Sequence, residues 1–262
     1  RYIDDAFAGV YIDELNEGYV TSWFADLNNR TGPGASNRTF EILKHMLNKA
    51  EEWGYRLENT NPCRSVRPNR KRQCERFLSN EELARLGAEL AKLRSSDDRT
   101  KQCVGAAITL LLLTGCRKSE ILTLEWSDIK GNRLHLRDSK TGPRTVWLGS
   151  AAREVIAGLP RFERVPYPFW NYSYRKPLRC VNGFWRRLRD EAGLPGVRIH
   201  DLRHTFASHA AMNKETLPMI GRLLGHANVQ TTARYAHLDD RHLLEAAQQI
   251  GDAVGALMDT HR

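Results

Sequence analysis

The run from Cys103 to Thr114 is almost entirely apolar, and it limits the possible folds more than any other segment does. A helix with apolar residues on every face must be covered on all sides by other elements. Gly115 follows directly, and glycine is the residue type that most often ends a helix. The sequence therefore predicts a central buried helix that other helices surround.

Helical periodicity also covers much of the remaining sequence. Apolar residues recur at helical spacing between residues 1 and 58, and a capping box from Ser79 to Glu82 begins a second helical region near residue 77. Later helices are expected at about 178–192, 200–212, 216–224, 229–236 and 239–258.

One β-hairpin interrupts this helical pattern. Residues 134–136 and 145–148 alternate in polarity on either side of a Gly-Pro turn. Residues 160–177 are rich in proline and aromatic residues, so we expect a long loop there. The predicted fold class is mainly α with a small antiparallel β-sheet or hairpin.

A basic segment at 59–76 separates the two helical regions. Pro68 keeps it extended, and its charge fits either a solvated connector or a linker along a phosphate backbone. The candidate DNA-binding residues of this linker are Arg64, Arg67, Arg70, Lys71 and Arg72. The whole chain carries a formal charge of +9, which favours a polyanionic partner such as nucleic acid over a basic surface that is merely solvated.

Targeting features are missing from the sequence. The longest apolar run, Ala106–Leu113, is too short to span a bilayer, and no secretory signal is visible. The five cysteines form no C-x-x-C pair, so we expect a cytoplasmic protein. The first residue is Arg1, not Met, which indicates a piece of a longer protein.

Two candidate cations lie on turns. Arg117 follows the central helix and begins the next one, where a guanidinium and free backbone N–H groups together favour an anion. Glu120 lies three residues on and would hold Arg117 in place, although an ordinary surface pair has the same spacing. Lys140 is expected at the tip of the hairpin, where it can reach into a groove.

The later candidates are clustered in the last third of the chain. His200 and Arg203 lie three residues apart, so a helix places them on one face. Two alternatives compete: His200 could simply cap the helix, or His200 and His204 could bind a metal, although the zincin pattern needs Glu where Asp201 stands. His226 follows a Gly turn, and Tyr235 follows a short helix; a lone tyrosine is usually a packing residue.

Taken together, these motifs resemble the tyrosine recombinase family, also called phage integrases. The resemblance rests on RFLSNEEL, TGCRKSEILTLEWSDI, SKTG, HDLRHTFASH and LLGHANVQTTARYAHL, within residues 77–245. The segment NRTFEILKHMLNKAEEWGY resembles the core-binding domain of such enzymes. The implied architecture is a helical, SAM-like core-binding domain at 1–58, a linker at 59–76 and a mixed α/β catalytic domain at 77–262. Many members carry an arm-type domain before these two, which this sequence does not show.

The resemblance also implies a role for each candidate residue. Arg117 and Arg203 would bind the scissile phosphate, and Lys140 would protonate the leaving 5′ oxygen. His200 would assist proton transfer at the tyrosine, and His226 would donate a hydrogen bond to the phosphate. Tyr235 would attack to form a 3′-phosphotyrosyl link, without a metal, ATP or another cofactor.

The implied function is site-specific DNA recombination, and the implied partner is double-stranded DNA carrying a specific site. Four protomers would pair two such sites, with the helix at about 239–258 swapped between neighbours and accessory DNA-bending proteins assisting. The gene would belong to a phage or mobile element, and the enzyme would act on nucleoid DNA. The alternatives are DNA relaxation of the type IB topoisomerase kind and a catalytically silent DNA-binding regulator.

Overall fold

The computed structural model describes residues 1–262 apart from 71–75, 138–141, 229, 237–239 and 260–262. The chain divides into two compact units, Arg1–Cys74 and Glu75–Arg262. Each unit has its own hydrophobic core.

The N-terminal unit is helical. It contains α1 (Asp4–Phe7), α2 (Glu17–Thr31), α3 (Pro33–Glu52) and the short 3₁₀ helix η1 (Pro62–Arg64). Gly32 has a φ of 80° and separates α2 from α3, where the sequence places Thr-Gly-Pro. Phe24 of α2 and Phe40 of α3 pack with ring centroids 4.8 Å apart, so the two long helices share one core.

The start of the basic segment packs on this N-terminal unit. Cys63 is fully buried, because it joins the core of α2 and α3. The backbone N–H of Asn69 donates to Asn37 Oδ1 at 2.8 Å, and Asn37 Nδ2 donates to the Asn69 carbonyl at 2.8 Å. Because of these contacts, the N-terminal unit extends beyond residue 58, where we expected the helical domain to end. A single apolar Cys63 and one asparagine pair were too weak a pattern to show this packing.

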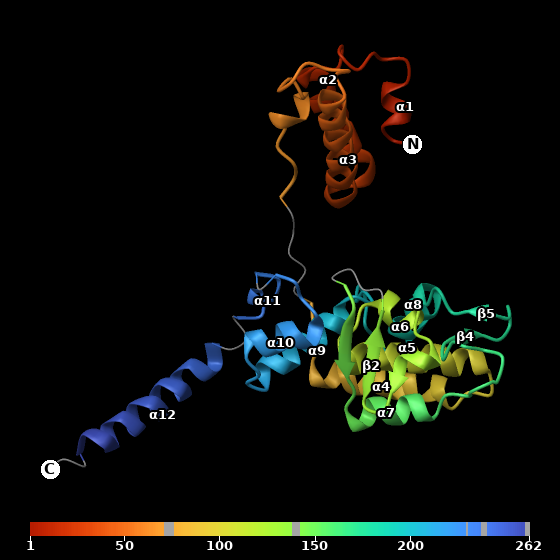
Figure 1. The fold of residues 1–262 in the computed structure, drawn as a ribbon, viewed down its shortest axis with the longest axis vertical. Coiled ribbons are helices and arrows are strands. Elements are labelled where there is room, and N and C mark those ends of the chain that lie inside the picture. The colour runs from red at the N-terminus through yellow and green to blue at the C-terminus, as the bar shows by residue number, and fades with distance from the viewer. Residues whose placement is uncertain (71–75, 138–141, 229, 237–239, 260–262) are drawn as a thin grey trace. The chain divides into compact units, whose positions relative to one another are not determined.

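The predicted central helix of the second unit is confirmed. It is α5 (Arg99–Thr114), and it packs against α4 (Asn80–Arg94), α7 (Ser150–Ala157) and α9 (Asp201–Met212) (Figure 1). Gly115 ends α5 with a φ of 63°, and an added Cβ there would lie 2.6 Å from the Phe206 ring. The helix end and α9 therefore approach as closely as a glycine permits.

The predicted hairpin is part of a three-stranded antiparallel sheet. Its strands are β1 (Ile129–Lys130), β2 (Arg133–Leu136) and β3 (Arg144–Trp147), in the order β1-β2-β3. Leu134 pairs with Val146, and both are buried against the core. The other helices of this unit are α6 (Lys118–Leu122), η2 (Trp126–Asp128), α8 (Asn182–Glu191), α10 (Leu217–Leu224), α11 (Gln230–Ala233) and α12 (Asp240–Asp259).

Two expectations are corrected by the structure. Residues 160–177 are not a loop throughout, because β4 (Trp170–Asn171) and β5 (Lys176–Pro177) form an antiparallel ladder within them. Strands of two residues are too short to show an alternating pattern. The helix expected at 229–236 is shorter, since α11 ends at Ala233. Within the described ranges, no helix is both long and apolar enough to cross a membrane.

Candidate active site

Arg117 enters the site at the turn between α5 and α6. Its backbone N–H donates to Glu120 Oε2, and its Nη1 donates to Glu120 Oε1, both at 2.8 Å. Glu120 is 3% exposed. Burial opposes its ionisation, but hydrogen bonds and charges from Arg144 and Arg117 outweigh burial and hold the pKa of the carboxyl below its usual range. Glu120 is thus a buried anion that fixes the Arg117 side chain.

A second guanidinium, that of Arg144 on β3, shares the same carboxylate. Arg144 Nη2 lies 2.8 Å from Glu120 Oε2, and its Nη1 donates to the Leu223 carbonyl at 3.1 Å. Gly225, with a φ of 68°, leaves room for this side chain, because a Cβ there would lie 2.6 Å from Arg144 Cδ. Arg144 therefore links α6, β3 and the end of α10.

Arg203 links the site from the α9 side. It is 4% exposed, and it donates from Nη1 to the Gly115 carbonyl at 2.7 Å and from Nη2 to the Leu224 carbonyl at 2.8 Å. Burial, followed by the charge of Arg117, lowers the pKa of Arg203 to about 10. The guanidinium is still a cation at neutral pH, and it is fixed between the ends of α5 and α10.

Two histidines lie within the field of these cations. His200 is the residue before α9, and burial followed by the charges of Arg203 and Arg198 lowers its pKa. His226 Nδ1 lies 2.8 Å from Thr232 Oγ1. Burial, then the charges of Arg203 and Arg117, lowers the pKa of His226 to about 4. Both imidazoles are therefore neutral at pH 7 and face a cationic centre.

Tyr235 is buried in the same region. Its hydroxyl lies 2.7 Å from His204 Nδ1, and the residue is 5% exposed. Burial raises the pKa of the phenol, although the charges of Arg234 and Arg203 act in the opposite direction. The ring packs among Ala207, Ala211, Ile220 and Leu224. Tyr235 thus lies within the electrostatic range of Arg203, with its hydroxyl held by α9.

The sequence profile of the phage integrase family matches residues 76–242, which is more than half of the chain. The chain belongs to the phage integrase family. The integrase of Haemophilus phage HP1 is 30% identical over 244 residues, which cover 92% of this chain and 67% of that protein. The integrase of Salmonella phage P22 is 26% identical, covering 82% of this chain and 56% of that protein.

A third relative is the tyrosine recombinase XerC of Thermodesulfovibrio yellowstonii, 30% identical over 71% of this chain and 65% of its own length. This chain thus spans about two thirds or less of the curated relatives it matches. Among solved structures, a lambda integrase dimer bound to a COC' core site has a TM-score of 0.71 at 18% identity, covering 89% of this chain and 84% of that chain. XerA recombinase has a TM-score of 0.53 at 25% identity. The predicted tyrosine recombinase architecture is confirmed.

Two members of this integrase site were missed by the sequence. Arg144 lies two residues before the buried Val146 on β3. Residues two apart on a strand point to the same face, so this spacing could have predicted that Arg144 points inward. His204 was considered only as a metal ligand partner of His200. Its position four residues after His200, on the same helix face, was the available signal for a place in the site. No group of three His, Cys, Asp or Glu side chains in the described part of the chain is arranged to hold a metal ion.

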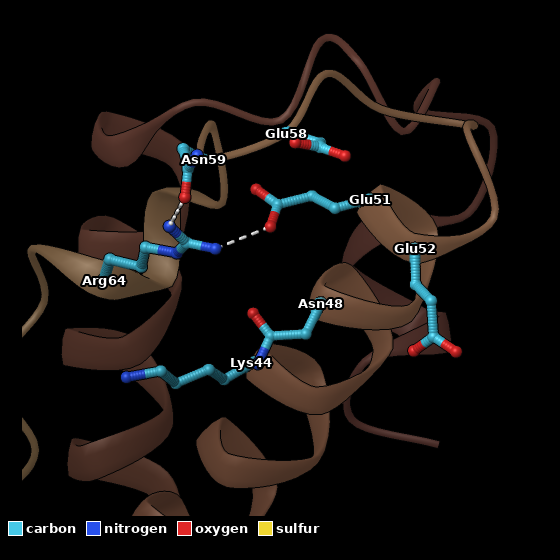
Figure 2. A pocket seen from close by; sticks show the side chains of 7 residues that line it. All are labelled: Lys44, Asn48, Glu51, Glu52, Glu58, Asn59 and Arg64. Atoms are coloured by element: carbon cyan, nitrogen blue, oxygen red, sulfur yellow. Dashed lines mark hydrogen bonds and ion pairs between the residues drawn. The ribbon is translucent and has the colours of Figure 1, made fainter.

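The other predicted residues either fall outside the described ranges or belong to the N-terminal unit. Lys140, Lys71 and Arg72 lie outside the described residues. Arg64 lies in the N-terminal unit, where it binds Glu51 Oε2 at 2.7 Å and Asn59 Oδ1 at 2.6 Å. Figure 2 shows it on the wall of a pocket whose other lining residues are Lys44, Asn48, Glu51, Glu52, Glu58 and Asn59. Its charge is partly offset there, whereas Arg67 and Arg70 are exposed.

Proposed function

We propose that this integrase-family chain is a site-specific DNA recombinase that cleaves and rejoins duplex DNA through a 3′-phosphotyrosyl link to Tyr235. The observation that carries the proposal is the position of the Tyr235 phenol. Its hydroxyl is hydrogen-bonded to His204, which follows Arg203 on α9. The proposed nucleophile Tyr235, which follows α11, is therefore held against α9, the helix that carries the proposed phosphate-binding cation Arg203.

The cations of the site suit a phosphodiester. Negative charge grows on the non-bridging oxygens as the nucleophile arrives, and fixed guanidinium donors stabilise that charge. Arg117 and Arg203 supply these donors, and His226 donates a further hydrogen bond. Glu120 and Arg144 fix Arg117 beforehand, so little reorganisation is needed when the phosphate binds.

The reaction needs no metal or ATP in this proposal. Attack by a side chain forms a phosphotyrosyl ester in place of the DNA ester, so the energy of the broken bond is kept for rejoining. Lys140 is the proposed general acid for the leaving 5′ oxygen. His200 is proposed to assist proton movement from the neighbouring position on α9.

The proposed partners are two DNA sites and three further copies of this chain. A lambda integrase tetramer has been solved on a Holliday junction. In this chain α12 carries exposed apolar side chains that fit a role in assembly, namely Ile250, Val254, Leu257 and Met258. The linker arginines Arg67 and Arg70, followed by Lys71 and Arg72, would follow the DNA backbone. We further propose that accessory DNA-bending proteins assist the reaction. The enzyme would act in the cytoplasm, and a phage or mobile element would encode it.

Tyr235→Phe tests the chemistry. We expect it to bind DNA like the wild type but to form no covalent adduct, because the ring packing is kept and the attacking oxygen is lost. DNA fragments trapped covalently by the wild type are sequenced to find the site, and a nicked duplex carrying that site is then run on a denaturing gel. Tyr174→Phe, at an exposed tyrosine of the same unit, is the control and should form the adduct normally.

The same assay separates the alternatives. An adduct with Tyr235→Phe contradicts the proposal, and a wild type without any adduct favours a DNA-binding regulator. A topoisomerase-like enzyme would form the adduct and relax supercoils but would not exchange strands between two sites. Strict dependence of cleavage on Mg²⁺ would favour a metal nuclease.

A further inference from the structure

The partner of the Tyr235 hydroxyl is His204, whose role the sequence left open. The oxygen lies 2.7 Å from His204 Nδ1, across 31 residues of sequence. His204 is 8% exposed and Tyr235 is 5% exposed, so this hydrogen bond is made away from bulk water. A short hydrogen bond between two buried titratable groups fixes both side chains and gives a path for one proton.

The protonation states of the two hydrogen-bonded groups follow from their surroundings. Burial first, then the charges of His200 and Arg234, lower the pKa of His204 to about 4, so the imidazole is neutral at pH 7. Burial raises the pKa of Tyr235, so the phenol keeps its proton. Because both groups are neutral, Nδ1 accepts from the phenol in the imidazole tautomer that carries its proton on Nε2, and proton acceptance from Tyr235 requires this tautomer.

His200 is one step further from the phenol. Its ring faces the His204 ring edge-on, with centroids 5.1 Å apart and planes at 85°. Among the described contacts, the phenolic oxygen is bonded to His204 and not to His200. His200, which precedes α9, lies one helical turn from His204, so His200 can act on Tyr235 through His204.

We propose that His204 is a catalytic residue that accepts the phenolic proton of Tyr235 during strand cleavage. The inference rests on the proposed function of Tyr235 as the nucleophile. In the step, the phenolic O–H bond breaks and its proton moves to Nδ1, while the tyrosine oxygen bonds to phosphorus. The bond from phosphorus to the 5′ oxygen breaks, and that oxygen takes a proton from the general acid. Rejoining reverses each transfer.

The DNA itself makes this transfer possible. Without DNA, a base with a pKa of about 4 cannot deprotonate a phenol whose pKa is raised, so Tyr235 remains neutral and unreactive. At neutral pH the cations that disfavour a charged His204 are Arg234 and Arg198, and Asp201 opposes them. A bound phosphate adds negative charge beside these cations and therefore stabilises a protonated His204. Proton transfer is thus coupled to the arrival of the substrate.

Two variants separate proton acceptance from mere positioning. The Oδ1 atom of His204→Asn can take the place of Nδ1 and hold the phenol, but an amide does not accept a proton at neutral pH. His204→Phe removes the hydrogen bond as well. We expect single-turnover cleavage of the nicked site duplex to fall about 100-fold in His204→Asn and at least as much in His204→Phe. His209→Asn, on the same helix and bonded to the Leu78 carbonyl, is the control and should cleave at the wild-type rate.

A fluorinated tyrosine at position 235 supplies the decisive readout. Fluorine lowers the pKa of the phenol, so it reduces the need for a proton acceptor. We expect trifluorotyrosine to raise the cleavage rate of His204→Asn about 10-fold relative to its effect in the wild type. A wild-type rate in His204→Asn overturns the proposal, and so does a slow rate that fluorination leaves unchanged. If the wild type forms no adduct, the proposed function fails as well; if it does and His204→Asn matches it, only the role of His204 fails.

Discussion

At the residue scale, the site depends on one buried carboxylate that serves two guanidiniums. Glu120 accepts from Arg117 and from Arg144, and its side chain is 2% exposed. Removing one partner of such a group leaves a buried charge without its full compensation, which costs more than the intact pair contributes. Arg144 is therefore as important to the geometry as the two arginines proposed to bind the phosphate.

Arg144→Met tests this role. We expect the free energy of unfolding of the second unit to fall by about 3 kcal/mol, since Glu120 loses a buried partner. Cleavage should fall too, because Arg117 is then held less rigidly. Urea denaturation followed by tryptophan fluorescence measures the change in stability.

Arg137→Met is the matched control for that measurement. Arg137 binds Glu125 and Asp128, but its side chain is 60% exposed. We expect a loss of less than about 1 kcal/mol there. Equal losses in the two variants would show that Arg144 is an ordinary surface cation.

At the element scale, one hydrogen bond holds the segment after α11 against α9. The pKa of His204 is about 4 in the folded chain and 6.5 in its ordinary state, so the unfolded chain binds more protons between these pH values. Stability therefore rises with pH across this window and is lost as the pH falls through it. Protonated Nδ1 also can no longer accept from the phenol.

This pH dependence gives a prediction for His204→Asn. Wild-type stability should decrease between pH 6.5 and about 4, at a slope that includes up to about 1.4 kcal/mol per pH unit from His204. His226 contributes in the same direction and is present in both proteins. We expect a flatter profile in His204→Asn, measured as urea midpoints across this range. Parallel profiles would contradict the buried, neutral state of His204.

The elements also show what the sequence could predict. The apolar run of α5, the capping box of α4 and the alternation in β2 and β3 are local patterns, and each predicted its element. The contacts of His204 with Tyr235 and of Arg144 with Glu120 join residues 31 and 24 positions apart. Such partners are set by helix packing, which no local pattern encodes. The order of the motifs identified the family, and the resemblance implied that His200 assists proton transfer at the tyrosine, but neither could show the hydrogen bond to His204.

At the scale of the whole molecule, α12 is the element suited to join protomers. Ile250 is 65% exposed and Val254 is 50% exposed, and they lie four residues apart on one helix face. Apolar side chains in this arrangement gain free energy when a second surface covers them. This apolar face of α12 fits the assembly role proposed for it.

The double variant Ile250→Asp, Val254→Asp tests assembly. We expect it to bind a single site but to lose the tetramer on paired sites, because two charges on this face oppose burial. Sedimentation with and without the site duplex measures the assembly state. Gln248→Asp, an exposed position on another face of α12, should leave the tetramer intact. A tetramer that survives the double variant would remove α12 from the interface.

The most direct test of the whole account is the identity of the residue joined to DNA. The wild-type protein is trapped on a nicked duplex, digested with protease and nuclease, and its nucleotide-bearing peptide is sequenced by mass spectrometry. The account predicts a single modified residue, Tyr235, linked through a 3′ phosphate. A link to another side chain, or cleaved DNA with no linked peptide, would contradict it.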